Sequence, residues 1–200
     1  MNFLAHAYLS FDYEPFIIGN MISDFVKGKK KYAFDDKIQA GIQLHRDIDT
    51  FTDEHPVIAE AKQVFRQKTG LYAGAFVDVA FDYFVANDLS LKTPLQWQQF
   101  SEKVYNVLSK NIHILPEHFL KILPWMVRED WLYNYRFKWG IQNSFNHVTR
   151  RAKFLDNDLD VFADFEENLD FLREKFNTFF PQLYLHAKDT VRALIREREL

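Results

Sequence analysis

The chain has 200 residues, of which 48% are hydrophobic, and a formal net charge of −3. These values predict one domain over residues 1–200 with a substantial core, and they argue against nucleic acid as a partner. Because the chain has no cysteine, disulfides, thiolate metal sites and cysteine nucleophiles are excluded. No apolar run approaches the roughly 20 residues that span a membrane, and no secretion signal is recognisable, so we expect a cytoplasmic protein without membrane insertion.

Hydrophobic residues recur mostly every three or four positions, and only six glycines and six prolines interrupt the chain. This spacing is typical of helices, so the sequence predicts an all-α fold, a single-domain helical bundle of nine or ten helices. The expected helices cover residues 2–10, 15–27, 35–54, 57–68, 72–88, 95–110, 117–127, 131–151, 159–178 and 181–198.

Glycine and proline mark several of the expected helix ends. Gly28 supplies a stop for the second helix, and Gly70 ends the fourth. Pro56 fits the first turn of that fourth helix, and Thr93 is a candidate N-cap for the sixth. A helix interior tolerates proline poorly, so Pro181 is expected to separate the last two helices.

The expected helix 35–54 carries charged side chains where its core face should be. Three isoleucines fall on one face at about 100° per residue, and His45 and Asp49 lie among them. Burying an unpaired carboxylate costs several kcal/mol, so a positive group must meet these side chains. A divalent cation would meet that need.

The expected helix 72–88 repeats the pattern. Between residues 73 and 86, apolar side chains surround Asp78 and Asp82, and a helix that is apolar all round is a buried one. Residues four apart are neighbours on one helix face, so each of the two pairs can offer two ligands to one point between packed helices. The alternative is that these acids pair with internal arginines or cap neighbouring helices; two such pairs favour the metal.

Four further residues are candidates for the same site. His6 lies in an apolar segment, where a lone histidine is more often a core residue than a ligand. Asp24 lies near the C-terminal end of its expected helix, which disfavours an acid and indicates an external reason for it. Arg46 suits a phosphate contact because a guanidinium binds phosphate oxygens bidentately; the alternative is an ion pair with a nearby aspartate. Asp53 lies on the same flank and borders the candidate site.

The sequence motifs of phosphate-binding loops, dinucleotide folds, serine hydrolases and HExxH metalloproteases are absent. Histidine and aspartate around a hard divalent cation, with an arginine nearby, instead indicate metal-assisted hydrolysis of a phosphate ester by water. Two basic clusters are also present, one made of Lys27, Lys29, Lys30 and Lys31, the other of Arg150, Arg151 and Lys153.

Six segments carry a resemblance to a known family: NFLAH (2–6), GNMISDFVKG (19–28), GIQLHRDIDTFTD (41–53), DVAFDYF (78–84), WLYNYR (131–136) and RRAKFLDND (150–158). Together they resemble the acyl carrier protein phosphodiesterase family, from Met1 to about Tyr184. That family is regarded as a divergent, all-α branch of the HD-type metal-dependent phosphohydrolases. The chain departs from the HD pattern, because none of its seven histidines is followed by aspartate.

The resemblance implies hydrolysis of the phosphodiester that joins 4′-phosphopantetheine to a serine of holo acyl carrier protein. It also implies Mn²⁺ as the cofactor, with Mg²⁺, Fe²⁺ or Co²⁺ as alternatives. The expected metal ligands are Asp24, His45 and Asp78, joined by Asp82 or His6. Asp49 would position the attacking water or hold a second metal, Arg46 would offset charge on the phosphate, and Asp53 is grouped with them as a catalytic candidate.

Acyl carrier proteins are generally acidic, and the first lysine cluster begins three residues after Asp24. We therefore expect Lys27, Lys29, Lys30 and Lys31 to form a cationic rim that steers the carrier toward the site; the alternative is an ordinary solvated loop. Two other functions stay open. One is an HD-type nucleotide phosphohydrolase, whose base could stack on the many aromatic residues, and the other is a non-enzymatic metal-binding helical bundle, although its typical Glu-x-x-His pairs are absent.

Overall fold

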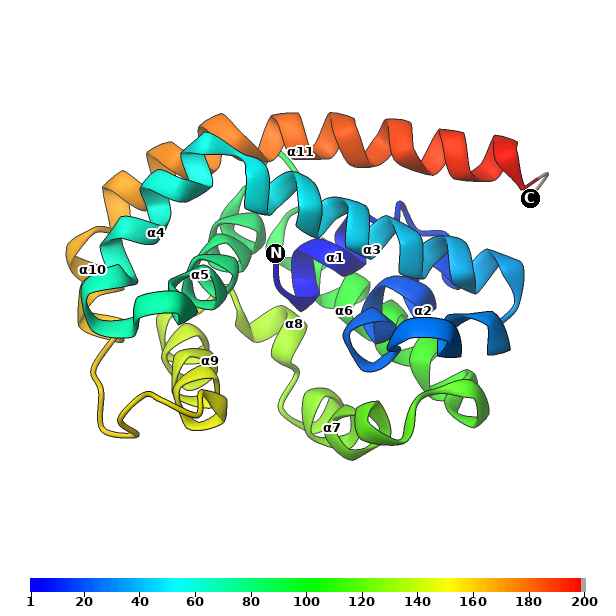
Figure 1. The fold of residues 1–200 in the computed structure, drawn as a ribbon, viewed down its shortest axis with the longest axis horizontal. Coiled ribbons are helices and arrows are strands. Elements are labelled where there is room, and N and C mark those ends of the chain that lie inside the picture. Colours follow the sequence, from blue (N-terminus) through cyan, green and yellow to red (C-terminus); the bar gives the residue numbers. More distant parts are fainter. Residues whose placement is uncertain (199–200) are drawn as a thin grey trace.

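The computed structural model describes residues 1–198, which form helices and connecting loops (Figure 1). The α-helices in this range are α1 (Phe3–Tyr8), α2 (Glu14–Ile22), α3 (Asp36–Glu54), α4 (Pro56–Thr69), α5 (Ala73–Asn87), α6 (Pro94–Lys110), α7 (Glu117–Arg128), α8 (Trp131–Asn134), α9 (Lys138–Arg151), α10 (Phe162–Glu167) and α11 (Leu169–Glu197). The 3₁₀ helices there are η1 (Ser23–Phe25), η2 (Gly28–Ala33), η3 (Gly70–Tyr72) and η4 (Ile112–Ile114). The all-α prediction is confirmed; positions 199 and 200 of the expected domain lie outside the described residues.

Several helix ends follow the local chemistry of the sequence. Pro56 is the first residue of α4, and Gly70 follows α4 with φ 55°. Thr93 opens α6 with a capping box, in which its hydroxyl accepts the Gln96 N–H and its own N–H is bound by the Gln96 side chain. Gly28, with φ 57°, does not end α2 as expected. Instead α2 stops at Ile22 and Gly28 begins η2.

The expected helix 131–151 is wrong, because the chain breaks it into α8 and α9. Phe137, between them, has an extended backbone with φ −106° and ψ 140°. The chain then turns back so closely that the Asn134 carbonyl approaches Gly140, where a Cβ atom would collide with it. A glycine at this position therefore permits the tight return that begins α9.

The expected break at Pro181 is also wrong. This part of the chain forms the short helix α10, Phe162–Glu167, and one 29-residue helix, α11, which continues through Pro181. Phe179 and Leu183, on either side of the proline, are fully buried, and α11 runs along α3 and α4 (Figure 1). Packing along this length offsets the roughly 3 kcal/mol cost of an internal proline. Although α11 is long, no helix among residues 1–198 is both long and apolar enough to cross a membrane.

The pair α2 and α3 forms the closest helix contact near the candidate site. Gly41 faces Phe16, and a Cβ atom on Gly41 would lie 2.8 Å from the Phe16 Cα and O atoms. Gly19, on α2, meets the backbone of α3 even more closely. Because Gly19 precedes Asn20 and Gly41 lies one turn before His45, this close approach brings Asn20 and His45 together.

Asp82 acts as a cap for another helix. Its two carboxylate oxygens accept hydrogen bonds from the backbone N–H groups of Leu4, at 2.8 Å, and Ala5, at 3.1 Å, in the first turn of α1. The side chain is fully buried. Burial raises the pKa of Asp82 to about 7, and the two backbone hydrogen bonds oppose that rise. The helix-capping alternative is therefore the one that holds for Asp82.

We expect Asp82→Ala to lower the free energy of unfolding by about 2–4 kcal/mol, because it leaves two buried N–H groups without an acceptor. Urea unfolding followed by circular dichroism measures this loss. Asp53→Ala is the control: Asp53 is exposed and pairs with Lys62 at the surface, and such a pair contributes under about 1 kcal/mol. Equal losses in the two variants would contradict the capping role.

Candidate metal centre

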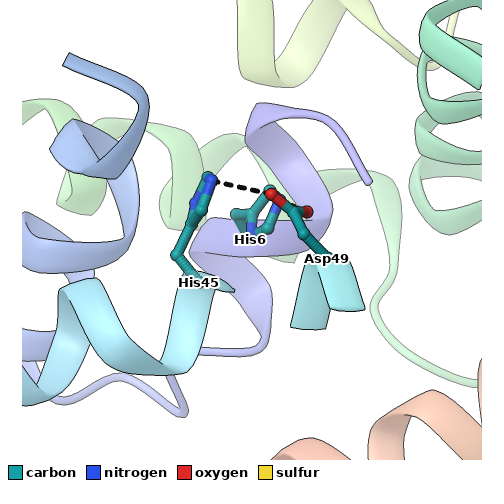
Figure 2. Close-up of side chains that lie close together, drawn as sticks. All are labelled: His6, His45 and Asp49. Carbon is teal, nitrogen blue, oxygen red and sulfur yellow. Dashed lines mark ion pairs between the residues drawn. The ribbon is translucent and has the colours of Figure 1, made fainter. Parts of the chain in front are cut away.

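Two histidines and an aspartate meet between α1 and α3. His6 is on α1, and His45 and Asp49 lie one turn apart on α3, with their side chains pointing toward one another (Figure 2). One donor atom from each residue lies within 4.8 Å of the other two, and the two imidazole rings stack with centroids 3.9 Å apart. Both histidines are buried, whereas the Asp49 side chain is 40% exposed. The cluster therefore reaches solvent through its carboxylate.

Asn20, on α2, orients both rings: its side-chain oxygen faces His6 and its backbone carbonyl faces His45. Its Nδ2 donates to the carbonyl of His6 at 2.8 Å and to the Ser10 hydroxyl at 3.1 Å, so its Oδ1 is left as an acceptor. His6 Nδ1 lies 2.8 Å from Asn20 Oδ1, and His45 Nδ1 lies 2.8 Å from the Asn20 carbonyl oxygen. Because both partners are acceptors, the hydrogen-bond network assigns a proton to Nδ1 of each ring.

The two Nε2 atoms consequently face the Asp49 carboxylate. His6 Nε2 lies 3.1 Å from Oδ1, and His45 Nε2 lies 3.1 Å from Oδ2. A neutral ring with its proton on Nδ1 has a lone pair on Nε2, and that lone pair repels a carboxylate oxygen at this distance. A second proton or a metal cation is therefore needed between the rings and Asp49.

The pKa values of His45, His6 and Asp49 indicate which of the three groups is protonated. Burial disfavours the charged form of His45, yet hydrogen bonds to Asp24 and Asp49 raise the pKa of His45 to about 9. Burial and the neighbouring charge of His45 lower the pKa of His6 to about 4. Burial opposes ionisation of Asp49, but the hydrogen bond from the His45 imidazolium holds the pKa of Asp49 well below its usual range. Near neutral pH, one imidazolium, on His45, thus lies beside an ionised Asp49.

Two expected ligands flank this cluster. Asp24, in η1, has a 70% exposed side chain whose Oδ1 lies 3.2 Å from His45 Nε2. That hydrogen bond lowers the pKa of Asp24. Asp78, on α5, pairs with the α-amino group of Met1 at 3.0 Å, and the same amino group lies 3.7 Å from Asp49. Both carboxylates are therefore adjacent to the cluster, Asp24 by direct contact with a ring and Asp78 through the Met1 ammonium.

Three other expected site residues are not brought into the cluster. Both oxygens of Asp82 are engaged in capping α1. Asp53 is exposed and pairs with Lys62 at 2.8 Å. Arg46 donates to the Val26 carbonyl at 3.0 Å, which ties α3 to the segment after η1.

Asn20 and the Met1 amino group are the site residues that the sequence analysis missed. Asn20 is a single polar residue in the apolar run FIIGNMI of α2, and it is fully buried. Burying an amide without hydrogen-bond partners costs free energy, as it does for a carboxylate. The position of Asn20 in an apolar run therefore indicated that it has buried polar partners. Ser10, also fully buried, belongs to the same network through Asn20 Nδ2.

The donor set fits a divalent cation. Metal-binding histidines usually donate their second ring N–H to an acceptor that fixes the tautomer, and Asn20 supplies that acceptor here for both rings. Two imidazole nitrogens together with carboxylate oxygens bind a transition-metal ion better than they bind Mg²⁺, because imidazole is a softer ligand than oxygen. The residues that could hold the ion are His6, His45 and Asp49, with Asp24 and Asp78 beside them.

Comparisons with known proteins agree with a hydrolytic centre. The sequence pattern described as acyl carrier protein phosphodiesterase matches residues 1–183. The chain belongs to the acyl carrier protein phosphodiesterase family, hydrolases that act on phosphodiester bonds. Acyl carrier protein phosphodiesterases of Escherichia coli strains K12 / DH10B and SE11 are 33% identical to it over 192 residues, which cover 94% of this chain and 97% of each relative. No solved structure matches the chain significantly.

Mn²⁺ binding is expected to release about one proton near pH 7.5, because His45, with a pKa of about 9, must lose its Nε2 proton to become a ligand. The affinity should therefore rise with pH, by up to about tenfold per unit between about pH 6 and pH 8. Isothermal titration calorimetry in buffers of different ionisation enthalpy measures both quantities. Binding without proton release would contradict this assignment.

The same titration separates the roles of individual residues. Asn20→Ala removes the side-chain acceptor of His6 Nδ1 but keeps the backbone carbonyl that faces His45, so it frees the His6 ring to change tautomer and is expected to weaken Mn²⁺ binding by about 10–100-fold. His186→Ala is the matched control, because His186 pairs with Asp47 of α3 at 2.7 Å, away from the cluster. It should leave the affinity unchanged.

Proposed function

We propose that this protein is a metal-dependent phosphodiesterase that removes the 4′-phosphopantetheine group from holo acyl carrier protein. Water attacks the phosphorus atom, the bond from phosphorus to the serine oxygen breaks, and the serine oxygen takes up a proton. The products are apo acyl carrier protein and 4′-phosphopantetheine. Family membership supports the class of substrate, since the relatives are named acyl carrier protein phosphodiesterases.

One observation carries the metal dependence: the Nε2 atoms of His6 and His45 converge on Asp49, each 3.1 Å from a carboxylate oxygen. A cation held there supplies Lewis acidity toward the phosphate and lowers the pKa of a water molecule. We propose Mn²⁺, because the donor set mixes imidazole nitrogen with several carboxylates; Fe²⁺, Co²⁺ and Mg²⁺ are the alternatives. Kinship with the HD-type phosphohydrolases is part of the same proposal.

The protein's own residues orient the reaction. Asp49 is ionised and partly exposed, so in the proposal it contacts the cation and orients the attacking water by accepting a hydrogen bond from it. Asp24 and Asp78 add negative charge on either side of the cluster. Arg46 donates one of its five N–H groups to the Val26 carbonyl. The remaining donors are available to contact a phosphate oxygen and offset its charge, as predicted for Arg46.

Incubation of the purified protein and Mn²⁺ with holo carrier protein should remove the phosphopantetheine arm, seen as a mass loss by intact mass spectrometry. Asp49→Asn keeps the side-chain size but removes the charge, so we expect it to lower kcat by about 10²-fold or more. His186→Ala again serves as the control and should retain wild-type turnover. Retention of the arm by wild-type protein with every one of the four cations would refute the proposed function.

The carrier would dock beside the cluster. The rim lysines Lys27, Lys29 and Lys30 are exposed, and Lys31 is partly so, in and just before η2. The segment joins the site through η1, where Asp24 contacts His45. A cationic rim at this place favours an acidic partner and acts mainly on the association rate.

Changing Lys29, Lys30 and Lys31 together to Glu is expected to lower kcat/KM for holo carrier protein by about tenfold or more at low salt. Hydrolysis of bis(4-nitrophenyl) phosphate, which has no carrier to dock, should change far less. The charge-matched control changes Lys188, Arg192 and Arg196 of α11 to Glu. If both triple variants lose activity on the carrier equally, the lysines are not the docking surface.

A further inference from the structure

A second feature lies next to the metal centre and has no part in the proposed chemistry. It is a pocket of about 330 Å³ lined by residues of α7 and α9 and completed by α8, α5 and the start of α1. Its apolar walls are formed by Phe3, Val79, Ile122, Trp125, Trp131 and Val148. The volume falls at the lower end of the range for small-molecule sites, about 300–1,000 Å³. We refer to it as the α7/α9 pocket.

The α7/α9 pocket shares a wall with the metal centre. Asn2 lines the pocket, while the carbonyl oxygen of Met1, one residue earlier, lies 3.1 Å from His6 Nε2. Asn2 Nδ2 donates to the Tyr135 hydroxyl at 2.9 Å, which anchors this segment in the pocket wall. On α5, the residue that follows Asp78 also lines the pocket. The pocket therefore adjoins the cluster at two places, the Met1–Asn2 segment and α5.

Indole rings dominate the open side of the pocket. Trp125 is 50% exposed, and the Arg128 guanidinium lies 4.1 Å from its ring centre. Trp131 donates from Nε1 to Glu129 at 3.1 Å, which holds its ring in place beside His147. Exposed aromatic surface is costly in water and is typical of a binding site when it lines a concave wall.

Polar groups lie among these rings. Ser144 and His147 of α9 line the pocket, and Arg150 and Arg151 from the last turn of α9 complete it. A wall that mixes indole faces with hydroxyl, amide and guanidinium groups suits an uncharged chain that alternates alkyl groups with amides. Such a chain can place methyl groups on the rings and hydrogen-bond its amides to the polar side chains.

We propose that the α7/α9 pocket binds the pantetheine portion of the substrate's arm while the metal centre holds its phosphate. This assignment rests on the proposed function, because the arm is covalently continuous with the phosphate. It makes Trp125 and Trp131 determinants of specificity for the arm that is removed from the carrier. A mononucleotide, with its base on an indole and its phosphate on Arg150 and Arg151, is the other ligand that this lining could accept.

The test compares Trp125→Ala with Trp139→Ala, a matched control, because Trp139 is 52% exposed and lies outside the lining of the pocket. Calorimetry with free pantetheine and with AMP measures binding without turnover, and kinetics with holo carrier protein give KM and kcat separately. We expect Trp125→Ala to weaken pantetheine binding and raise KM by about tenfold each, with a smaller effect on kcat. Trp139→Ala should match the wild-type protein in both assays.

The outcomes separate the two proposals. Equal behaviour of the two tryptophan variants, or binding of AMP but not of pantetheine, would overturn the pocket assignment even if the wild-type protein removes the arm. Pantetheine binding that depends on Trp125, in a protein that leaves holo carrier protein intact, would support the pocket and refute the proposed function. Val148→Phe narrows the pocket from another side and should reduce pantetheine binding in the same way; unchanged binding in this variant would also overturn the assignment.

Discussion

The hydrogen bonds of Asn20 are the constraint on which the site depends. Its Nδ2 donates to the His6 carbonyl and to Ser10, which leaves Oδ1 to accept from His6 Nδ1, while its backbone carbonyl accepts from His45 Nδ1. Both rings are thereby turned with Nε2 toward Asp49. The two rings come from different helices, α1 and α3. The close backbone contact of α2 with α3, at Gly19 and Gly41, lets Asn20 reach both of them.

The aspartates near the site differ in the groups that they contact. Asp82 is fully buried and both its oxygens accept hydrogen bonds from the first turn of α1, so it fixes the helix that carries His6. Asp49 and Asp78 instead face the imidazolium of His45 and the Met1 ammonium. A cation in the proposed position would take over the role of the His45 proton, so we expect metal binding to be coupled to proton loss there.

Helical periodicity in the sequence was sufficient to predict the all-α fold and to find His45 and Asp49, because a charged pair on an apolar helix face is visible without knowing its neighbours. It could not separate Asp78 from Asp82, since the two differ only in what α1 presents to them. Pro181 was misread because buried packing on both sides of it overrides its local effect. The role of Asn20 depends on contacts with α1 and α3, and no local pattern encodes those contacts.

The candidate metal centre and the α7/α9 pocket come largely from different parts of the chain. The cluster and its supporting amide come from residues 6–49, on α1 to α3, whereas most of the α7/α9 pocket comes from residues 122–151. The two parts meet at the first residues of the chain and at α5, where Asp78 belongs to one and Val79 to the other. Because neighbouring residues on a helix point in different directions, we expect substitutions in the pocket to change binding of the arm without moving the groups proposed to hold the phosphate.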